Sequence, residues 1–351
     1  MQREGAMIWR YPSWRLASAQ LKGYALATLV ALAVFAILLA AAGKDPLRAY
    51  ADTAVYVFGN AYGFSELLVR MVPLIFTAIA VALPARIGLI NVGGEGQLYM
   101  GAWLATAGAL ALANQPALVI LPVLILLGFI GGGVWALLPG LLRALRLVNE
   151  TISTLLLNYI APLIVNYFIF GPWRDPQNSF YPQSPAFSDS ARLPTFFHSR
   201  VHVGLAIALA CLALYWFVTT HTRFGLEMRA IGGNPEAARR LGIPVFGYIL
   251  IVMFAAGGVA GLAGMAEVAA IQGRLVSELS PGYGFIGFLV SWLAKTSAVG
   301  IVAMSFLFAV ISSVGDILQI TQGLPFAVVN ILMAVILFIV LGRGQAGSVA
   351  R

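Results

Sequence analysis

The residues best placed to do chemistry in this chain lie in a glycine-dense stretch, residues 86–101, which reads RIGLINVGGEGQLYMG. Asn91, Glu95 and Gln97 stand there among five glycines. Glycines weaken a continuous helix, and a helix broken inside a membrane protein frees backbone groups for a polar solute. We therefore predict that this segment lines or gates a solute path. The alternative is close helix packing through small residues, with Glu95 bonded inside the protein. The sequence leaves open whether Glu95 contacts solute or is structural.

A second set of polar residues decorates an otherwise apolar segment, residues 150–166 (ETISTLLLNYIAPLIVN). Thr151, Thr154 and Asn158 follow an i, i+3, i+7 spacing, which places them on one face of a helix. Thr154 and Asn158 are therefore further candidates for the path. Hydrogen bonding between helices of a bundle explains the same pattern equally well.

A third segment, residues 280–292 (SPGYGFIGFLVSW), alternates glycines with aromatic residues. It resembles the first segment in being a short, broken start to an apolar run, and Tyr283 and Phe285 are its candidate path residues. The two segments would occupy matching places in an inverted repeat, with membrane spans 2–5 in one half and spans 7–10 in the other.

The most strongly charged internal segment is residues 222–243, TRFGLEMRAIGGNPEAARRLGI. Asn234 can cap a helix, Pro235 suits its first position and Glu236 suits the positive end of its dipole. Gly242 and the proline that follows end this helix after roughly two turns. A short, rigid, charged helix favours docking onto a soluble partner, with arginines contacting acidic residues there. An ordinary basic loop is the alternative.

The sequence lacks the residues that several other kinds of chemistry require. No G-x-x-x-x-G-K-[ST] motif occurs, so the chain is not expected to bind ATP itself. One cysteine, Cys211, and three histidines without ligand spacing predict no metal site. The acidic residues are scattered, which disfavours a membrane enzyme such as a lipid-linked sugar transferase. The net charge of +8 reflects basic residues kept on cytoplasmic loops, and it does not indicate nucleic-acid binding.

The elements that must position these residues are membrane helices. The chain is 60% hydrophobic and 10% charged, whereas soluble domains are about a quarter charged. Apolar runs long enough to cross a bilayer core of about 30 Å recur along it. We predict an all-α polytopic membrane protein embedded in the lipid bilayer, with about ten transmembrane helices, some of them broken or re-entrant. The predicted spans are 24–43, 68–85, 90–112, 117–138, 152–170, 203–220, 246–270, 284–294, 298–314 and 325–341, of which the third and eighth are least regular.

Basic residues set the expected orientation. With the N-terminus inside, 14 of the 21 Lys and Arg residues fall on cytoplasmic segments and 7 on outer ones. Both termini are therefore predicted to be cytoplasmic, including residues 1–23. Residues 171–201 are predicted to form an external loop, and residues 222–243 a cytoplasmic segment. We treat residues 1–351 as a single transmembrane domain.

These motifs also carry a family resemblance. GLINVGGEGQLYMGA, NETISTLLLNYIA, GPWRDP and the 222–243 segment, in this order over about residues 65–342, resemble the permease subunits of bacterial ABC importers. The chain is most similar to the nucleoside-type branch of the ribose/branched-chain amino acid permease superfamily. The resemblance makes 222–243 a cytoplasmic segment that couples to the ATPase, and it places 91–97 near the translocation path. The coupling residues are then Arg229, Gly232, Asn234, Pro235, Glu236, Arg239 and Arg240.

The resemblance also implies partners and a location. It implies a heterodimer with a second homologous permease, separate ABC ATPase subunits that bind ATP and Mg, and an external solute-binding protein or lipoprotein. No cofactor is expected on this chain, which would be a multi-pass protein of the bacterial cytoplasmic (inner) membrane.

One departure from the family pattern concerns the solute. Family members often carry Gly-Ile-Ala-Val-Ala-Leu after the Gly-Tyr-Gly-Phe segment, whereas this chain has the bulkier IGFLVSW at residues 286–292. Amides and aromatic residues along the path, with few charges, suit a neutral polar solute with a stackable base. We therefore predict a nucleoside permease, with a permease for a simple sugar such as ribose as the alternative.

Overall fold

The computed structural model describes residues 43–177, 180–196 and 199–323, with a few single positions toward the two ends. Contacts within the chain define two compact units. One unit is Val57–Ser313, and the other joins Met1–Tyr56 to Val314–Arg351. All the candidate site residues belong to Val57–Ser313, so this unit is the one that positions the site.

Helices form the regular elements of the described residues, apart from two isolated β-bridges, and this confirms the predicted all-α class. The helices are α2 (Pro46–Phe58), α3 (Ala61–Ala85), α4 (Gly94–Ala111), α5 (Ala117–Ala144), α6 (Glu150–Phe170), η1 (Asp189–Ala191), α7 (Gly204–His221), α8 (Arg223–Gly233), α9 (Pro235–Arg240), α10 (Val245–Ala266), η2 (Glu267–Gln272), α11 (Tyr283–Leu293) and α12 (Ala298–Gln322).

Five helices among the described residues are long and apolar enough to cross a membrane: α3, α5, α6, α7 and the run Val245–Gln272 formed by α10 and η2. The predicted polytopic membrane protein is thereby confirmed. Most helix ends lie within a few residues of the predicted spans. α3 begins at Ala61, before the predicted start at residue 68. The prediction missed its first turns because Ser65 and Glu66 lower their hydropathy. The predicted spans at 24–43 and 325–341 lie outside the continuously described residues, so the total of ten stays a prediction.

The two predicted irregular spans are the ones that the structure breaks. α4 begins only at Gly94, after the turn formed by residues 86–93, which we call the polar turn. α11 is eleven residues long and follows an irregular stretch that ends at Gly282, whose φ is 96°. Glycine reaches this left-handed conformation at little cost. Gly94 at the start of α4 and Gly284 in the first turn of α11 are both buried within the protein.

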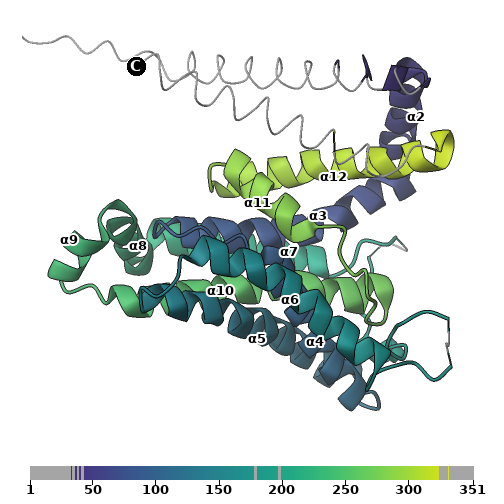
Figure 1. The fold of residues 1–351 in the computed structure, drawn as a ribbon. Coiled ribbons are helices and arrows are strands. Elements are labelled where there is room, and N and C mark those ends of the chain that lie inside the picture. Colours follow the sequence, from purple (N-terminus) through teal and green to yellow (C-terminus); the bar gives the residue numbers. More distant parts are fainter. Residues whose placement is uncertain are drawn as a thin grey trace, which may run out of the picture. The chain divides into compact units, whose positions relative to one another are not determined.

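Glycines let the central helices approach closely. α10 contacts α3, α4 and α5, and Figure 1 shows α8 and α9 together at one end of this bundle. A Cβ added at Gly101 of α4 would collide with the backbone of Gly261 of α10, and one added at Gly261 would collide with the carbonyl oxygen of Gly128 of α5. Small residues at such crossings replace side-chain interdigitation by backbone contact, as is common between membrane helices.

This crossing gives a stability prediction. Gly261→Ala should destabilise the protein by about 1–3 kcal/mol, the usual cost of overpacking, because backbone atoms rather than a flexible side chain must move. Gly247→Ala on the same helix is the matched control, since nothing lies within 4 Å of its added Cβ. Thermal unfolding of the purified protein in detergent should give a lower midpoint for Gly261→Ala and an unchanged or slightly higher one for Gly247→Ala. Equal midpoints for the two variants would contradict the close crossing.

Candidate solute path and coupling segment

The polar turn is closed by an amide pair. Asn91 Nδ2 donates to Gln97 Oε1 at 3.1 Å, and Gln97 Nε2 donates back to Asn91 Oδ1 at 2.9 Å. Asn91 also donates to the carbonyl oxygen of Ala80 at 3.0 Å and accepts from the backbone N–H of Gly93 at 3.0 Å. Both side chains are buried. These two candidate path residues therefore hold the turn in shape, and most of their hydrogen-bonding groups are used within the protein.

Helix α6 holds the same turn from the other side. Thr154 Oγ1 accepts from the N–H of Val92 at 3.2 Å, and Asn158 Nδ2 donates to the carbonyl of Val92 at 2.8 Å. Asn158 Oδ1 accepts from the N–H of Gly96 at 2.8 Å. Thr154 and Asn158, one turn apart on α6, thus face the same backbone position and meet both of its polar groups, whereas no such contact is made by Thr151 among the described residues. In this geometry they bridge helices, which is the role that the sequence left open beside path lining.

Glu95 joins the two broken segments. Its Oε2 accepts from the N–H of Gly284 in the first turn of α11 at 2.7 Å, and the residue is 6% exposed. Gly282 offers no side chain to cap α11, so Glu95 supplies an acceptor from across the bundle. A Cβ at Gly284 would collide with the backbone N of Glu95. The starts of α4 and α11 are therefore in contact, while the inverted repeat stays a prediction.

The aromatic candidates lie at the same junction. Tyr283 begins α11 and is half-buried, while its carbonyl accepts from Thr77 Oγ1 at 3.1 Å. Phe285 is 39% exposed. The structure thus brings the seven predicted path residues to one region, around the starts of α4 and α11. Asn91, Glu95, Gln97, Thr154 and Asn158 are buried there, and Phe285 is open.

Glu150 is a further member of this region, and the sequence alone predicted no role for it. This buried residue starts α6, and its Oε1 accepts from the N–H of Ile90 at 3.3 Å. Its Oε2 lies 3.0 Å from Nε of Arg143, so the charge is paired. A glutamate directly after the capping residue Asn149 favours a helix start, and that local signal gives no hint of the polar turn as its partner.

The charged segment 222–243 contains two helices. α9 begins as predicted: Asn234 Oδ1 accepts from the N–H groups of Glu236 and Ala237, each at 3.0 Å, and Pro235 takes the first position. α9 ends in a Schellman motif, in which Gly242 N donates to the carbonyl of Arg239 and Ile243 N to that of Ala238. Gly242 has a φ of 82°, which a glycine adopts freely. The predicted helix and its stop signal are confirmed.

Apolar residues fasten this segment to the polar turn. Met228, Ile231 and Ala238 share one buried cluster with Ile87 and Leu89 of the turn and with the first turns of α10. At the same place the backbone of Gly232 lies against the carbonyl of Arg86, leaving no room for a Cβ. The segment and the turn therefore form one packed body at this end of the bundle.

The predicted coupling arginines have different surroundings. Arg229 Nη1 donates to the carbonyl of Thr219 at 2.6 Å, which ties α8 to the end of α7. Arg239 pairs with Glu236 at 3.0 Å on the exposed surface of α9. Arg240 is exposed. Arg239 and Arg240 thus face outward, whereas Arg229 already serves a contact within the chain.

A further polar junction was missed because Arg86 was counted only as a loop charge. Arg86 Nη2 donates to the carbonyl of Thr296 at 2.9 Å, and its Nε donates to Tyr215 Oη at 3.1 Å. Tyr215 Oη donates to the same Thr296 carbonyl at 2.6 Å. Lys295 and Thr296 have φ values of 49° and 55°, and a β-branched residue is strained there. Arg86 and Tyr215 hold this strained turn after α11.

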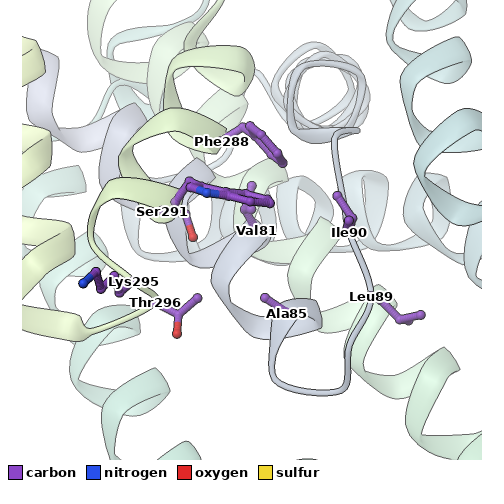
Figure 2. Close-up of a pocket in the computed structure, with 9 residues that line it drawn as sticks. Val81, Ala85, Leu89, Ile90, Phe288, Ser291, Lys295 and Thr296 are labelled. Atoms are coloured by element: carbon purple, nitrogen blue, oxygen red, sulfur yellow. The ribbon is translucent and has the colours of Figure 1, made fainter. Parts of the chain in front are cut away.

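A cavity of about 310 Å³ lies between α3, the polar turn and the end of α11 (Figure 2). It is largely apolar, with an indole, a phenyl ring and few polar side chains. The lining residues are Val81, Ala85, Leu89, Ile90, Phe288, Ser291, Trp292, Lys295 and Thr296. Three of them belong to the 286–292 stretch in which the sequence departs from the family pattern.

Comparison with known proteins identifies the class of molecule that contains this site. Residues 63–341 match the family described as "Branched-chain amino acid transport system / permease component". The chain belongs to this family. Because the match spans the polar turn, α6, the charged segment and α11, the features described above are all parts of an ABC permease.

Individual relatives agree with this assignment. The chain is 38% identical to the glucose ABC transporter permease TsgB13 of Haloferax volcanii, over 90% of this chain and 86% of the relative. It is 32% identical to the guanosine ABC transporter permease NupP of Bacillus subtilis, over 90% and 91%. It is 30% identical to the nucleoside ABC transporter permease NupB of Lactococcus lactis, over 87% and 86%.

The chain is therefore a multi-pass permease subunit of an ABC transporter of the cytoplasmic (inner) membrane, and it is not itself an enzyme. Permeases of this family act with ATPase subunits, which use the ATP, and with a solute-binding protein. The predicted family, fold class and non-enzymatic role are confirmed. Three points go beyond this assignment: which solute is moved, which second permease pairs with the chain, and on which side of the membrane its termini lie.

Proposed function

We propose that this permease moves a nucleoside into the cell. Two relatives named for guanosine or nucleoside transport cover most of the chain at 32% and 30% identity. The surroundings of the candidate path are amide-rich and aromatic, which suits a neutral solute with a flat base. A sugar is the second candidate, because the glucose permease TsgB13 is 38% identical to this chain.

Uptake by the reconstituted importer distinguishes the two solutes. The permease, its second permease, the ATPase subunits and the solute-binding protein would be placed in proteoliposomes, with ATP on the ATPase side. We expect labelled guanosine or adenosine to accumulate, unlabelled nucleosides to compete, and glucose and ribose to have no effect. Accumulation of glucose without nucleoside uptake would establish the sugar candidate instead.

We propose that residues 222–243 receive the movement of the ATPase. The observation that carries this proposal is the shared cluster of Met228, Ile231 and Ala238 with Ile87 and Leu89 of the polar turn. A capped helix packed on that turn moves with it, so displacement of α9 would displace the start of α4. Asn234, Pro235 and Glu236 keep α9 rigid, while Arg239 and Arg240 are the outward contacts to the ATPase.

We propose that the seven path residues border the solute route, with the buried ones shaping it. Asn91, Gln97, Thr154 and Asn158 fix the polar turn, and Glu95 fixes the start of α11. This hydrogen-bond network holds the polar turn in one arrangement. A displacement of the turn by the coupling segment would break these bonds and favour a second arrangement, as a gate requires. Tyr283 and Phe285 add an aromatic border beside it.

We further propose that the permease pairs with a different second permease. Bacillus subtilis has two guanosine ABC transporter permeases among the relatives, NupP and NupQ, and Lactococcus lactis has two nucleoside permeases, NupB and NupC. Residues 1–351 would then form one transmembrane permease domain in a heterodimer. An external solute-binding protein or lipoprotein would deliver solute to the outer face.

The proposed orientation puts both termini, residues 1–23 and residues 222–243 in the cytoplasm, and residues 171–201 outside. In a Cys211→Ala background, an impermeant thiol reagent added to intact cells should label Ala186→Cys in the external loop. It should label Ala237→Cys of α9 only after the cells are permeabilised. Both positions are exposed, so accessibility of the side chain does not separate them. The opposite pattern would reverse the topology.

A further inference from the structure

The cavity under α11 has aromatic walls from one helix face. Phe288, Ser291 and Trp292 follow an i, i+3, i+4 spacing, so all three reach the same side of α11. Phe288 and Trp292 have ring centroids 5.4 Å apart at an interplanar angle of 40°. Trp292 is half exposed, and Figure 2 shows Phe288 and Ser291 on the α11 side with Val81 and Ile90 across from them. The site is therefore a slot between rings and aliphatic side chains, which fits a flat molecule.

Ser291 adds an unsatisfied polar group. It is 1% exposed, and its Oγ has no hydrogen-bond partner within the part of the chain that the structure describes. A helical serine usually bonds the carbonyl four residues earlier, and an unpaired buried hydroxyl costs free energy. A hydroxyl left unpaired at the wall of a cavity calls for a partner, which a water molecule or a ligand can supply.

The charges around the cavity restrict that ligand. Among the lining residues that the structure describes, Lys295 carries the one formal charge, and no carboxylate is present. Lys295 is exposed, and its ammonium is a donor of hydrogen bonds only. The cavity thus disfavours a cationic ligand and favours acceptor atoms on a flat ring. A nucleobase has these properties, whereas a simple sugar presents no ring face with π electrons.

We propose that this cavity is an inward station for the base of the transported nucleoside. Trp292 and Phe288 form the wall against which the base stacks, Ser291 Oγ bonds a ring heteroatom or exocyclic group, and Lys295 contacts an acceptor at the rim. This inference rests on the proposed nucleoside function. It assigns solute contact to residues 288–295, and the buried amides of the polar turn keep their structural bonds.

The opposite wall links this station to ATP hydrolysis. Leu89 lines the cavity and also belongs to the cluster that fastens residues 222–243 to the polar turn. The carbonyl of Thr296, at the other end of the cavity, is held by Arg86 and Tyr215. Movement of the coupling segment would therefore change the width of the slot, which provides a way to release a bound base.

Photolabelling tests the station directly. The complete importer in nanodiscs would be irradiated with tritiated 8-azidoadenosine, and the labelled peptides identified by mass spectrometry. We expect label on the α11 peptide containing residues 288–295, competed by guanosine and not by glucose. Base–aromatic stacking is worth roughly 5- to 150-fold in affinity. Trp292→Leu should therefore weaken labelling about tenfold or more, and Ser291→Ala several-fold, while Trp292→Phe should keep most of it.

The controls separate this inference from loss of folding and from the proposed function. Trp216→Leu on α7 removes an indole that is equally half exposed, and it should leave labelling unchanged. Each variant must assemble with its partners, as judged by gel filtration. If the parent complex imports nucleosides but labels elsewhere, or if Trp292→Leu labels normally, the station is wrong and the function stands. If a photoreactive phospholipid labels this peptide and adenosine does not compete, the cavity is a lipid site. If the parent complex imports glucose and no nucleoside, the proposed function itself fails.

Discussion

Alanine in place of Gly232 should leave the importer assembled and able to hydrolyse ATP, but it should reduce ATP-driven uptake by about tenfold. A Cβ at this position would collide with the carbonyl oxygen of Arg86, and it would also approach the Cα of Ile87 at 3.5 Å. Backbone atoms cannot yield as a side-chain end can, so the coupling segment and the polar turn must separate. Overpacking of this kind costs about 1–3 kcal/mol, which is enough to shift a two-state equilibrium by roughly 5- to 150-fold.

Gly233→Ala is the matched control for this experiment. Gly233 is the next residue of α8, and nothing lies within 4 Å of a Cβ added there. The two variants therefore carry the same substitution at neighbouring positions of α8, and only the Gly232 variant meets the turn. Uptake and solute-stimulated ATP hydrolysis would be measured in the same proteoliposomes. Equal uptake by the two variants would mean that the Gly232 contact carries no movement, and that residues 222–243 act as a basic loop.

Local signals predicted the elements well. Asn234-Pro235-Glu236 and Gly242 determine the start and end of α9 through bonds between near neighbours, so a sequence pattern can be read directly as structure. Glycine density around Gly94 and Gly284 likewise predicted where two spans would be broken. Helix starts and breaks depend on backbone freedom and nearby hydrogen bonds, which residue types largely determine.

Partners far apart in the chain could not be predicted in this way. The carboxylate of Glu95 meets Gly284 across 189 positions, and Gly232 meets Arg86 through backbone atoms alone. Nothing in the residue types of either pair specifies the other member. The sequence therefore identified Glu95 as important but could not tell solute contact from an internal bond. The Arg86 junction and the cavity under α11 were missed for the same reason.

The second large effect is expected from Asn158, whose side chain spans the polar turn. Asn158→Leu should sharply reduce uptake and lower the thermal stability of the complex. The change removes the acceptor for the N–H of Gly96 and the donor to the carbonyl of Val92, both 2.8 Å away. Each buried group left without a partner costs about 1–3 kcal/mol, and no bulk water is available at membrane depth to replace it. The turn that begins α4 should therefore lose its fixed shape.

Asn166→Leu is the matched control, because Asn166 lies two turns later on α6. It shows whether the effect of Asn158→Leu comes from losing this bridge or from losing any amide side chain of α6. Asn166 Oδ1 is buried with no hydrogen-bond partner among the described residues, so its removal should cost little or even stabilise the protein. Asn158→Asp keeps the acceptor for Gly96 but loses the donor and buries a carboxylate, so it should also fall well below the parent. Uptake and the midpoint of thermal unfolding would be measured for all three variants. If Asn158→Leu is as stable as Asn166→Leu but transports poorly, Asn158 acts on the solute and the bridge is not its main role. If Asn158→Leu is as stable and also transports normally, Asn158 has neither role.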